Sequence, residues 1–118
     1  MAAPNLVTTT SIIGKTAAEW VPTTLTAILS NPTNSSQAYR INVLYITNLG
    51  LTDDVVTVDI YRNSISYKLA SAIPVPVGNS LVVIAKDTSI YLEESDALRV
   101  SAGQAGSLQY VLSYEIMS

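Results

Sequence analysis

Cysteine, histidine and phenylalanine are all missing from this sequence of 118 residues. Without cysteine there is no disulfide and no thiolate nucleophile. Without histidine the chain lacks the side chain that most often serves as a zinc ligand or as a general base near neutral pH. These absences exclude most of the common enzyme chemistry and all zinc fingers.

Charge is also scarce. Charged residues make up 13% of the chain, whereas the hydrophobic class makes up 48% and the mean hydropathy is +0.34. The net charge is −3, and the basic residues stand singly at Lys15, Arg40, Arg62, Lys68, Lys86 and Arg99. This pattern gives no electrostatic footprint for nucleic acid. We expect instead a surface that packs against other protein.

Long hydrophobic runs are missing too. The longest, such as Val43–Ile46 and Leu81–Ala85, are far shorter than the roughly 18 residues of a membrane helix. The N-terminal residues lack the basic region of a secretory signal peptide. We therefore expect no membrane partner. A chain without cysteine suits a reducing cytoplasm, but also a protein assembled in a cell and later released, so the compartment stays open.

Alternation of apolar and polar residues with a period of two dominates the chain and predicts β-strands. It is clearest near the C-terminus, where Leu108, Tyr110 and Leu112 fall on one face. It recurs in Asp53–Arg62, with Asp59 on the solvent face, and in Ala97–Ala102. The run Ile41–Thr47 is apolar on both faces and predicts a central strand or an interface.

Turn residues separate these strands at short intervals, which favours antiparallel connections. Asn48–Gly50, Arg62–Ser64 and Gly103–Gly106 each predict a turn. Pro74–Pro76 predicts an edge or an extended connection, because proline cannot donate a ladder hydrogen bond. With about eight or nine strands, we predict an all-β chain with one domain over residues 1–118, an antiparallel β-sandwich that is jelly-roll-like or immunoglobulin-like.

The first 37 residues hold only two charged side chains, Lys15 and Glu19. Strands fit Leu6–Ile13 and Thr23–Ser30 there. The one segment that could form a helix is Thr16–Trp20, which is short and ends before Pro22, because the residue before a proline avoids the helical region. The apolar, uncharged character of Leu6–Ile13 makes residues 1–14 a candidate N-terminal assembly arm.

No motif predicts catalysis. The acidic residues at 53–54 and 93–96 predict solvated turns, and no calcium-loop pattern occurs. Gly14-Lys15-Thr16 lacks the first glycine of a phosphate-binding loop, because that position is Thr9. No base is placed to activate a serine. We predict a protein that is not an enzyme, with no catalytic residue, no cofactor and no metal site.

Trp20 has three interpretations: core packing, a contact between subunits, or stacking on a carbohydrate. The scarcity of charge favours the contact between subunits over the carbohydrate. We predict interface residues among the apolar side chains of the N-terminal region and the two-faced strand: Leu6, Val7, Ile12, Ile13, Trp20, Leu44 and Ile46.

Several stretches in fixed order resemble a family of small virion structural proteins of tailed phages, most of all those of contractile-tailed cyanophages. The stretches are Met1–Asn5, Ile13–Thr16, Asp53–Arg62, Tyr67–Ala70, Ile73–Pro76, Leu81–Val83, Lys86–Val100 and Leu112–Ile116. The resemblance covers most of the chain and includes no catalytic motif.

This resemblance implies a component of the virion, assembled in the host cytoplasm. A small β-sandwich of low charge suits a capsid decoration, or cement, protein that docks in many copies on the head. A neck, tail or fibre-attachment role is the alternative, and a carbohydrate-binding module for host attachment is a third. The partners implied are further copies of the chain, with a trimer as one option, and other virion proteins such as the major capsid protein or neck and tail proteins.

Overall fold

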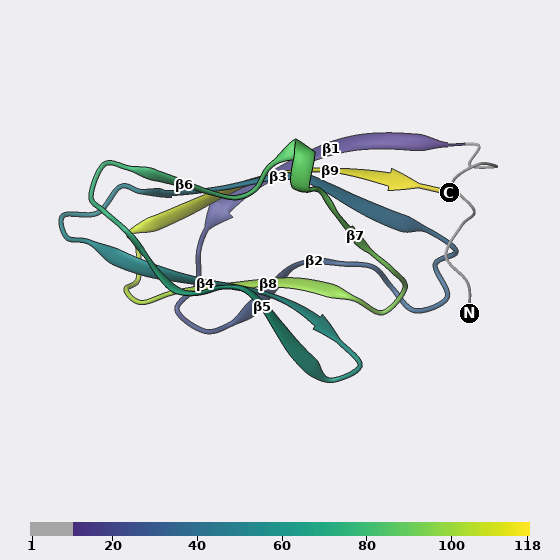
Figure 1. Ribbon diagram of the computed structural model, residues 1–118, viewed down its shortest axis with the longest axis horizontal. Helices are drawn as coiled ribbons and strands as arrows, with labels where there is room; N and C mark the ends of the chain where they lie inside the picture. The colour runs from purple at the N-terminus through teal and green to yellow at the C-terminus, as the bar shows by residue number, and fades with distance from the viewer. Residues whose placement is uncertain (1–10) are drawn as a thin grey trace.

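Nine strands and one short 3-10 helix make up residues 11–118, the part of the chain that the computed structural model describes (Figure 1). They are β1 (Ile12–Trp20), β2 (Thr26–Ser30), β3 (Ala38–Asn48), β4 (Asp54–Arg62), β5 (Ile65–Val75), β6 (Ser80–Ile84), η1 (Lys86–Thr88), β7 (Ile90–Leu92), β8 (Ala97–Ala102) and β9 (Leu108–Met117). Sheet A has the order β1-β9-β3-β6, with β7 also paired to β3, and sheet B has the order β2-β8-β4-β5. The predicted antiparallel β-sandwich is confirmed.

The pairing of the strands identifies the fold as a jelly roll. β1 pairs with β9, β2 with β8, β3 with β6 and β7, and β4 with β5. The chain is thus one long hairpin whose successive pairs lie alternately in sheet A and sheet B. The further pairs β3–β9 and β4–β8 join neighbouring windings. Of the two sandwiches that the sequence left open, this winding is the jelly-roll form.

The hydrophobic core lies between the two sheets and draws on both. Inward-facing side chains of alternating residues fill it, as the period of two predicted. The largest fully buried ones are Ile41, Leu44, Ile46, Ile84, Leu92, Leu98, Leu108, Leu112, Val21, Val56, Val58 and Val75. The predicted inward faces of β4, β8 and β9 are therefore confirmed.

The predicted turns lie between strands, one in the β4–β5 hairpin and two where the chain crosses from one sheet to the other. Asn63 (φ 53°) and Ser64 (φ 63°) both adopt the left-handed conformation between β4 and β5, which is the backbone of a tight hairpin turn. Gly106 (φ 71°) does the same between β8 and β9. Pro74 lies in β5, an edge strand of sheet B, as its missing N–H requires.

Two predictions for the N-terminal region were wrong. Residues 16–20 are strand, not helix, because β1 pairs with β9 from Ile12 opposite Met117 to Trp20 opposite Gln109. A five-residue helix would form few internal hydrogen bonds, whereas sheet pairing satisfies the backbone along the whole segment. Ile12 and Ile13 therefore begin a strand instead of ending one. Residues 6–10 of the predicted strand Leu6–Ile13 lie outside the described residues, and β2 occupies the later part of the predicted strand Thr23–Ser30.

Candidate interaction surface

A row of apolar side chains crosses the outer face of sheet A. Opposite residues in an antiparallel pair share a face, so the register places Ala18 of β1, Val111 of β9, Tyr45 of β3 and Val82 of β6 side by side. All four are exposed: Val111 to 41%, Tyr45 to 44% and Val82 to 50%, and Ala18 likewise. Their sheet neighbours Leu112 and Leu44 point into the core, which fixes the outward direction of this row.

The rows on either side are uncharged, and most of their residues are polar. Trp20, Gln109, Thr47 and Ser80 form one, and Thr16, Ser113 and Val43 form the other. The first charged pair in the described part of this face lies beyond them, where Arg40 and Glu115 approach to 3.8 Å. We call the three rows together the sheet A patch. A broad uncharged area with an apolar row at its centre is a candidate contact surface.

Trp20 lies at the rim of the sheet A patch. Its residue is 45% exposed, and a hollow of about 210 Å³ beside it is lined by Ala18, Glu19, Gln109, Tyr110 and Val111. The backbone N–H of Trp20 donates a hydrogen bond to the Glu19 carboxylate at 3.1 Å. Of its three interpretations, core packing is wrong, because a buried tryptophan would not leave so much of its surface in water.

The seven predicted interface residues do not lie together. Ile12 (61%) and Ile13 (51%) are exposed near the start of β1, on the same edge strand as Trp20. Leu6 and Val7 lie outside the described residues. Leu44 and Ile46 are fully buried in the core, so their prediction as interface residues was wrong.

The outward side of β3 is the one that carries Tyr45, not the one that carries Leu44 and Ile46. Both faces of this strand are apolar, so the pattern alone does not tell which side meets the core. The structure turns Leu44 and Ile46 inward and leaves Tyr45 on the sheet A patch. Val82 and Val111, which were not singled out, sit opposite Tyr45 on the flanking strands. Val82 and Val111 are identified by the register of β3 with its neighbouring strands, and a single sequence does not contain that register.

The outer face of sheet B carries an ionic row in the equivalent place. Arg99 of β8 and Lys68 of β5 lie opposite Asp59 of β4 on its two sides. The Arg99 guanidinium donates to Asp59 at 2.9 and 2.5 Å, and the Lys68 Nζ lies 3.8 Å from it. Ser66 donates a further hydrogen bond to Asp59. The Arg99 guanidinium also lies 4.0 Å above the ring of Tyr61.

Asp59 is fully buried by these partners, so its predicted exposure to solvent was wrong. Burial by itself would raise the pKa of Asp59, but hydrogen bonds from Arg99 and Ser66 and the charges of Arg99 and Lys68 hold the pKa below its ordinary value. The pKa of Arg99 is raised, chiefly by its hydrogen bond to Asp59. This arrangement is a closed ion cluster whose charges are satisfied within the chain.

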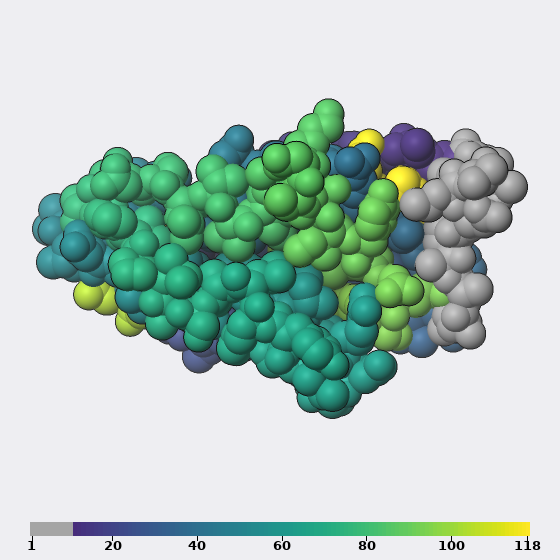
Figure 2. Space-filling view, in the orientation of Figure 1, coloured from purple at the N-terminus to yellow at the C-terminus, as the bar shows by residue number. Residues whose placement is uncertain are grey.

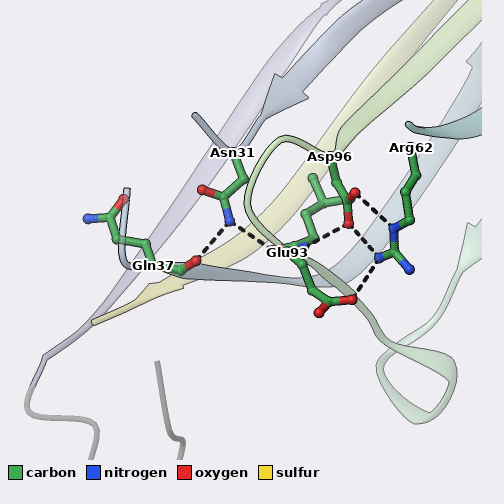
Figure 3. A network of polar contacts seen from close by, with 6 residues as sticks. Asn31, Gln37, Arg62, Glu93 and Asp96 are labelled. Carbon is green, nitrogen blue, oxygen red and sulfur yellow. Dashed lines mark hydrogen bonds and ion pairs between the residues drawn. The ribbon is translucent and has the colours of Figure 1, made fainter. Parts of the chain in front are cut away.

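A second polar network ties together the end of the sandwich where β3 begins and β9 ends (Figure 3). The Asp96 carboxylate accepts hydrogen bonds from Arg62 at 2.8 and 2.5 Å and from the Glu93 N–H at 2.9 Å. The Asn31 amide donates to the carbonyls of Gln37 and Leu92 at 2.9 and 3.0 Å. The network joins the β4–β5 hairpin to the loops before β3 and β8.

Asp96 is buried, so the prediction that all carboxylates of residues 93–96 are solvated was wrong for it. Its hydrogen bond is the main reason that the pKa of Arg62 is raised. Asp54 departs from the same prediction: it is buried and accepts hydrogen bonds from the Val55 and Gln104 N–H groups at 2.7 and 3.1 Å. A Cβ added at Gly103 would lie 2.6 Å from Asp54 Oδ1, so this close approach requires glycine.

The three buried carboxylates, Asp54, Asp59 and Asp96, thus form hydrogen bonds within the chain that stabilise the fold. Within the described residues, no group of three or more acidic side chains is placed to hold a metal ion.

Burial raises the pKa of Tyr39 and of Tyr110, with smaller contributions from Tyr114 and from Glu19 respectively. No helix in residues 11–118 has the length and apolar character needed to cross a membrane.

Comparison with known proteins adds information on the fold. No protein-family model matches the chain, and no curated protein sequence matches it. A chain of a solved structure described as "Bacillus endospore appendages form a novel family of disulfide-linked pili" is similar, with a TM-score of 0.50 and 17% sequence identity. The alignment covers 99% of this chain and 95% of that chain. At 17% sequence identity this similarity concerns the fold alone.

Proposed function

We propose that this protein is a structural subunit of a tailed-phage virion, without enzymatic activity, and that it docks in many copies on the head as a decoration protein. The observation that carries the docking is the sheet A patch, an uncharged surface with an apolar central row and an exposed tryptophan at its rim. The virion is proposed from the resemblance of the sequence to virion structural proteins. Interfaces between proteins are poor in charge at their centre and rich in aromatic residues, as this patch is.

The fold and the composition support the same proposal. Jelly rolls form viral capsid domains as well as lectin domains, so the fold is compatible with a virion component. The similar solved chain belongs to pili, which are structural assemblies, and this gives one case in which the fold serves assembly. Those pili are disulfide-linked, whereas this chain has no cysteine, so disulfides could not join its copies.

Immunogold labelling of intact virions tests the location. The antibody is raised against the whole chain, and labelling is repeated after mild disruption of the heads so that a hidden epitope is exposed. Gold spread over the heads supports decoration. Gold confined to the neck or tail supports the neck, tail or fibre-attachment alternative, and no gold in either preparation contradicts a virion role.

The docking surface is tested separately with purified protein. Val111→Lys places a charge at the centre of the sheet A patch, where desolvating it on contact would be costly. We expect the variant to bind undecorated heads at least tenfold more weakly than the unaltered protein. Equal binding would show that another surface makes the contact.

A carbohydrate-binding module is a second candidate function, because the exposed indole of Trp20 beside a hollow can stack on a sugar ring. A glycan array distinguishes the two uses. Binding to a glycan that is lost in Trp20→Ala would favour host attachment, whereas no glycan binding, with head binding intact, would favour decoration.

A further inference from the structure

Strand β1 forms an open edge of sheet A. Within residues 11–118 it pairs with β9 alone, and all of its residues except Ala17 are exposed. Figure 2 shows the purple atoms of β1 at the upper outline of the molecule, beside the yellow atoms of β9. An open edge presents a row of backbone N–H and C=O groups to which another strand can add.

The other edge strands carry features that hinder such an addition. Shifts in register interrupt the pairing of β2 with β8, of β6 with β3 and of β5 with β4, and β5 also contains Pro74. β7 has only three residues. The pairing of β1 with β9, in contrast, runs without a shift from Ile12 to Trp20. Among the edges that the structure describes, β1 is therefore the one best suited to add a strand.

Every second residue of β1 directs its backbone groups to the open edge. Val21, the residue after β1, donates a backbone hydrogen bond to Leu108, so odd-numbered residues direct their groups toward β9. The backbone N–H of Trp20 donates to the side chain of Glu19 and not to β9, which agrees with this alternation. The even-numbered residues are thus the ones that can bond an added strand: Gly14, Thr16, Ala18 and Trp20.

The two charges of β1 decide which strand can be added. Lys15 and Glu19 are exposed, and they lie opposite Tyr114 and Tyr110 of β9, on the core side of the sheet. They have opposite signs and stand two residues before and two residues after Ala17. A strand that covered either charge without pairing it would pay the cost of its desolvation. The added strand must therefore bring an anion to Lys15 and a cation to Glu19.

A second copy of β1 brings both. In an antiparallel pair of β1 strands centred on Ala17, Lys15 of each copy faces Glu19 of the other. This register also places even-numbered residues opposite each other, as the free backbone groups require. Every other register that meets this requirement either sets like charges face to face or leaves both charges opposite uncharged residues.

The side chains on the outer face fit the same register. Gly14 of one copy faces Trp20 of the other, and a Cβ added at Gly14 would meet no atom within 4 Å. Trp20 is 45% exposed, so its indole can lie across this open space. Nearer the centre Thr16 faces Ala18, and both side chains are small enough to let the strands approach.

We propose that two copies of the chain pair through β1, antiparallel and centred on Ala17, so that their two A sheets form one continuous sheet. The contact is isologous, and its two-fold axis is perpendicular to the sheet, so both sheet A patches face the same side. Edge pairing leaves Val111, Tyr45 and Val82 uncovered, and the pair therefore presents two patches to one surface. The pairing goes beyond the proposed function, because it concerns the contact of the copies with each other.

Single cysteines can trap the pair, because the chain has none of its own. A single strand edge is a small contact beside the roughly 1,200 Å² of a stable interface, so the test captures weak pairs by mild oxidation. Ala17→Cys places two thiols opposite each other at the two-fold axis. The Cα atoms there lie about 4.5 Å apart, within the range that a disulfide spans. Ala18→Cys is the control, because this more exposed residue faces Thr16 of the second copy.

We expect Ala17→Cys to yield at least ten times as much disulfide dimer as Ala18→Cys. Random collision would favour the more exposed cysteine, so an excess at Ala17 reports the proposed pair. Equal yields, or more dimer from Ala18→Cys, would overturn the proposal. Circular dichroism checks that both variants fold.

An exchange of charges tests the register. In the Ala17→Cys background, Glu19→Lys and Lys15→Glu each set like charges opposite each other, and each should lower the dimer yield at least tenfold. In an equal mixture of these two variants every facing pair is again of opposite sign. Mass spectrometry should then find the mixed dimer in at least tenfold excess over either homodimer. A statistical mixture of the three dimers would overturn the register.

The result is separable from that of the proposed function. If Val111→Lys prevents docking on heads but Ala17→Cys and Ala18→Cys give equal yields, the proposed function stands and the edge pairing is wrong. If Ala17→Cys traps the pair but no virion is labelled with gold, the edge pairing stands and the virion role is wrong.

Discussion

The outer faces of the two sheets have the same geometry and opposite chemistry. In each, four strands bring one residue apiece into a row. In sheet A the row is Ala18, Val111, Tyr45 and Val82. In sheet B it is Ala27, Arg99, Asp59 and Lys68. The first row is apolar and exposed, whereas the second centres on a carboxylate that its neighbours bury completely.

The ionic row of sheet B stabilises the fold, whereas the apolar row of sheet A is a surface available for contact. The charges of sheet B are satisfied by one another, so that face has little to gain from a partner. The central row of sheet A is apolar, and the area that it exposes remains available for burial. A contact with another protein would therefore use sheet A, and substitutions in the two rows should affect different properties.

The largest effect is expected in the ionic row. Asp59→Ala removes the acceptor of Arg99, Ser66 and Lys68 and leaves a partly buried guanidinium without its counter-charge. We expect a loss of about 3 kcal/mol in the free energy of unfolding, measured by urea denaturation. Asp87→Ala, at an exposed position in η1, is the control and should change it by less than about 0.5 kcal/mol. Equal effects of the two variants would mean that the ion cluster does not stabilise the fold.

The next effect concerns assembly and compares two valines of similar exposure. Val111 is 41% exposed on the outer face of sheet A, and Val55 is 38% exposed on β4 of sheet B. Val111→Lys should weaken self-association at least tenfold, which is about 1.4 kcal/mol. Val55→Lys should leave it unchanged. Sedimentation velocity over a range of concentrations measures both, and weakening by Val55→Lys alone would reverse the assignment of the contact face.

Much of the fold could be predicted from the sequence because the core depends on a local pattern. In β9 up to Glu115 the inward residues alternate with outward ones of which all but Val111 are polar, so the prediction for Leu108, Tyr110 and Leu112 is correct. The hairpin at Asn63 was predictable for a similar reason, because few residue types tolerate its backbone conformation. The choice between two sandwich topologies was not, because it depends on which distant strands pair.

The candidate site was harder to predict because it depends on register. β3 is apolar on both faces, and only its pairing with β6 and β9 shows that Tyr45 faces outward. Asp59 shows the reverse case. Its place in the alternation correctly indicated the outer face, but Arg99, 40 residues later in the chain, covers it. Position on an outer face and exposure to solvent are different properties, and sequence patterns report only the first.

Making the outer row of sheet B apolar, like that of sheet A, tests whether such a row is sufficient for self-association. Asp59→Val with Arg99→Val replaces the central ion pair by two apolar side chains. Because the desolvation cost of the pair disappears with its attraction, the free energy of unfolding should stay within about 1 kcal/mol of the unaltered value. The new apolar row should cause self-association that persists when Val111→Lys is added. If the combined variant stays monomeric, an apolar outer row is not sufficient for association.

The smallest effect expected is on the response to acid. The pKa of Asp59 in the folded chain lies below its ordinary value of 3.8, so the carboxylate binds protons more weakly when folded than when unfolded. Its contribution to stability is complete above that ordinary value and is lost as the pH falls through the folded pKa. Asp59→Asn lacks this contribution at every pH. The difference in unfolding free energy between the unaltered chain and Asp59→Asn should be constant from pH 7 to 5 and shrink below about pH 4. Urea denaturation at pH 7, 5 and 3 measures it, with Asp87→Asn as the matched control. A difference that stays constant to pH 3 would mean that Asp59 acts through packing and hydrogen bonding, and not through its charge.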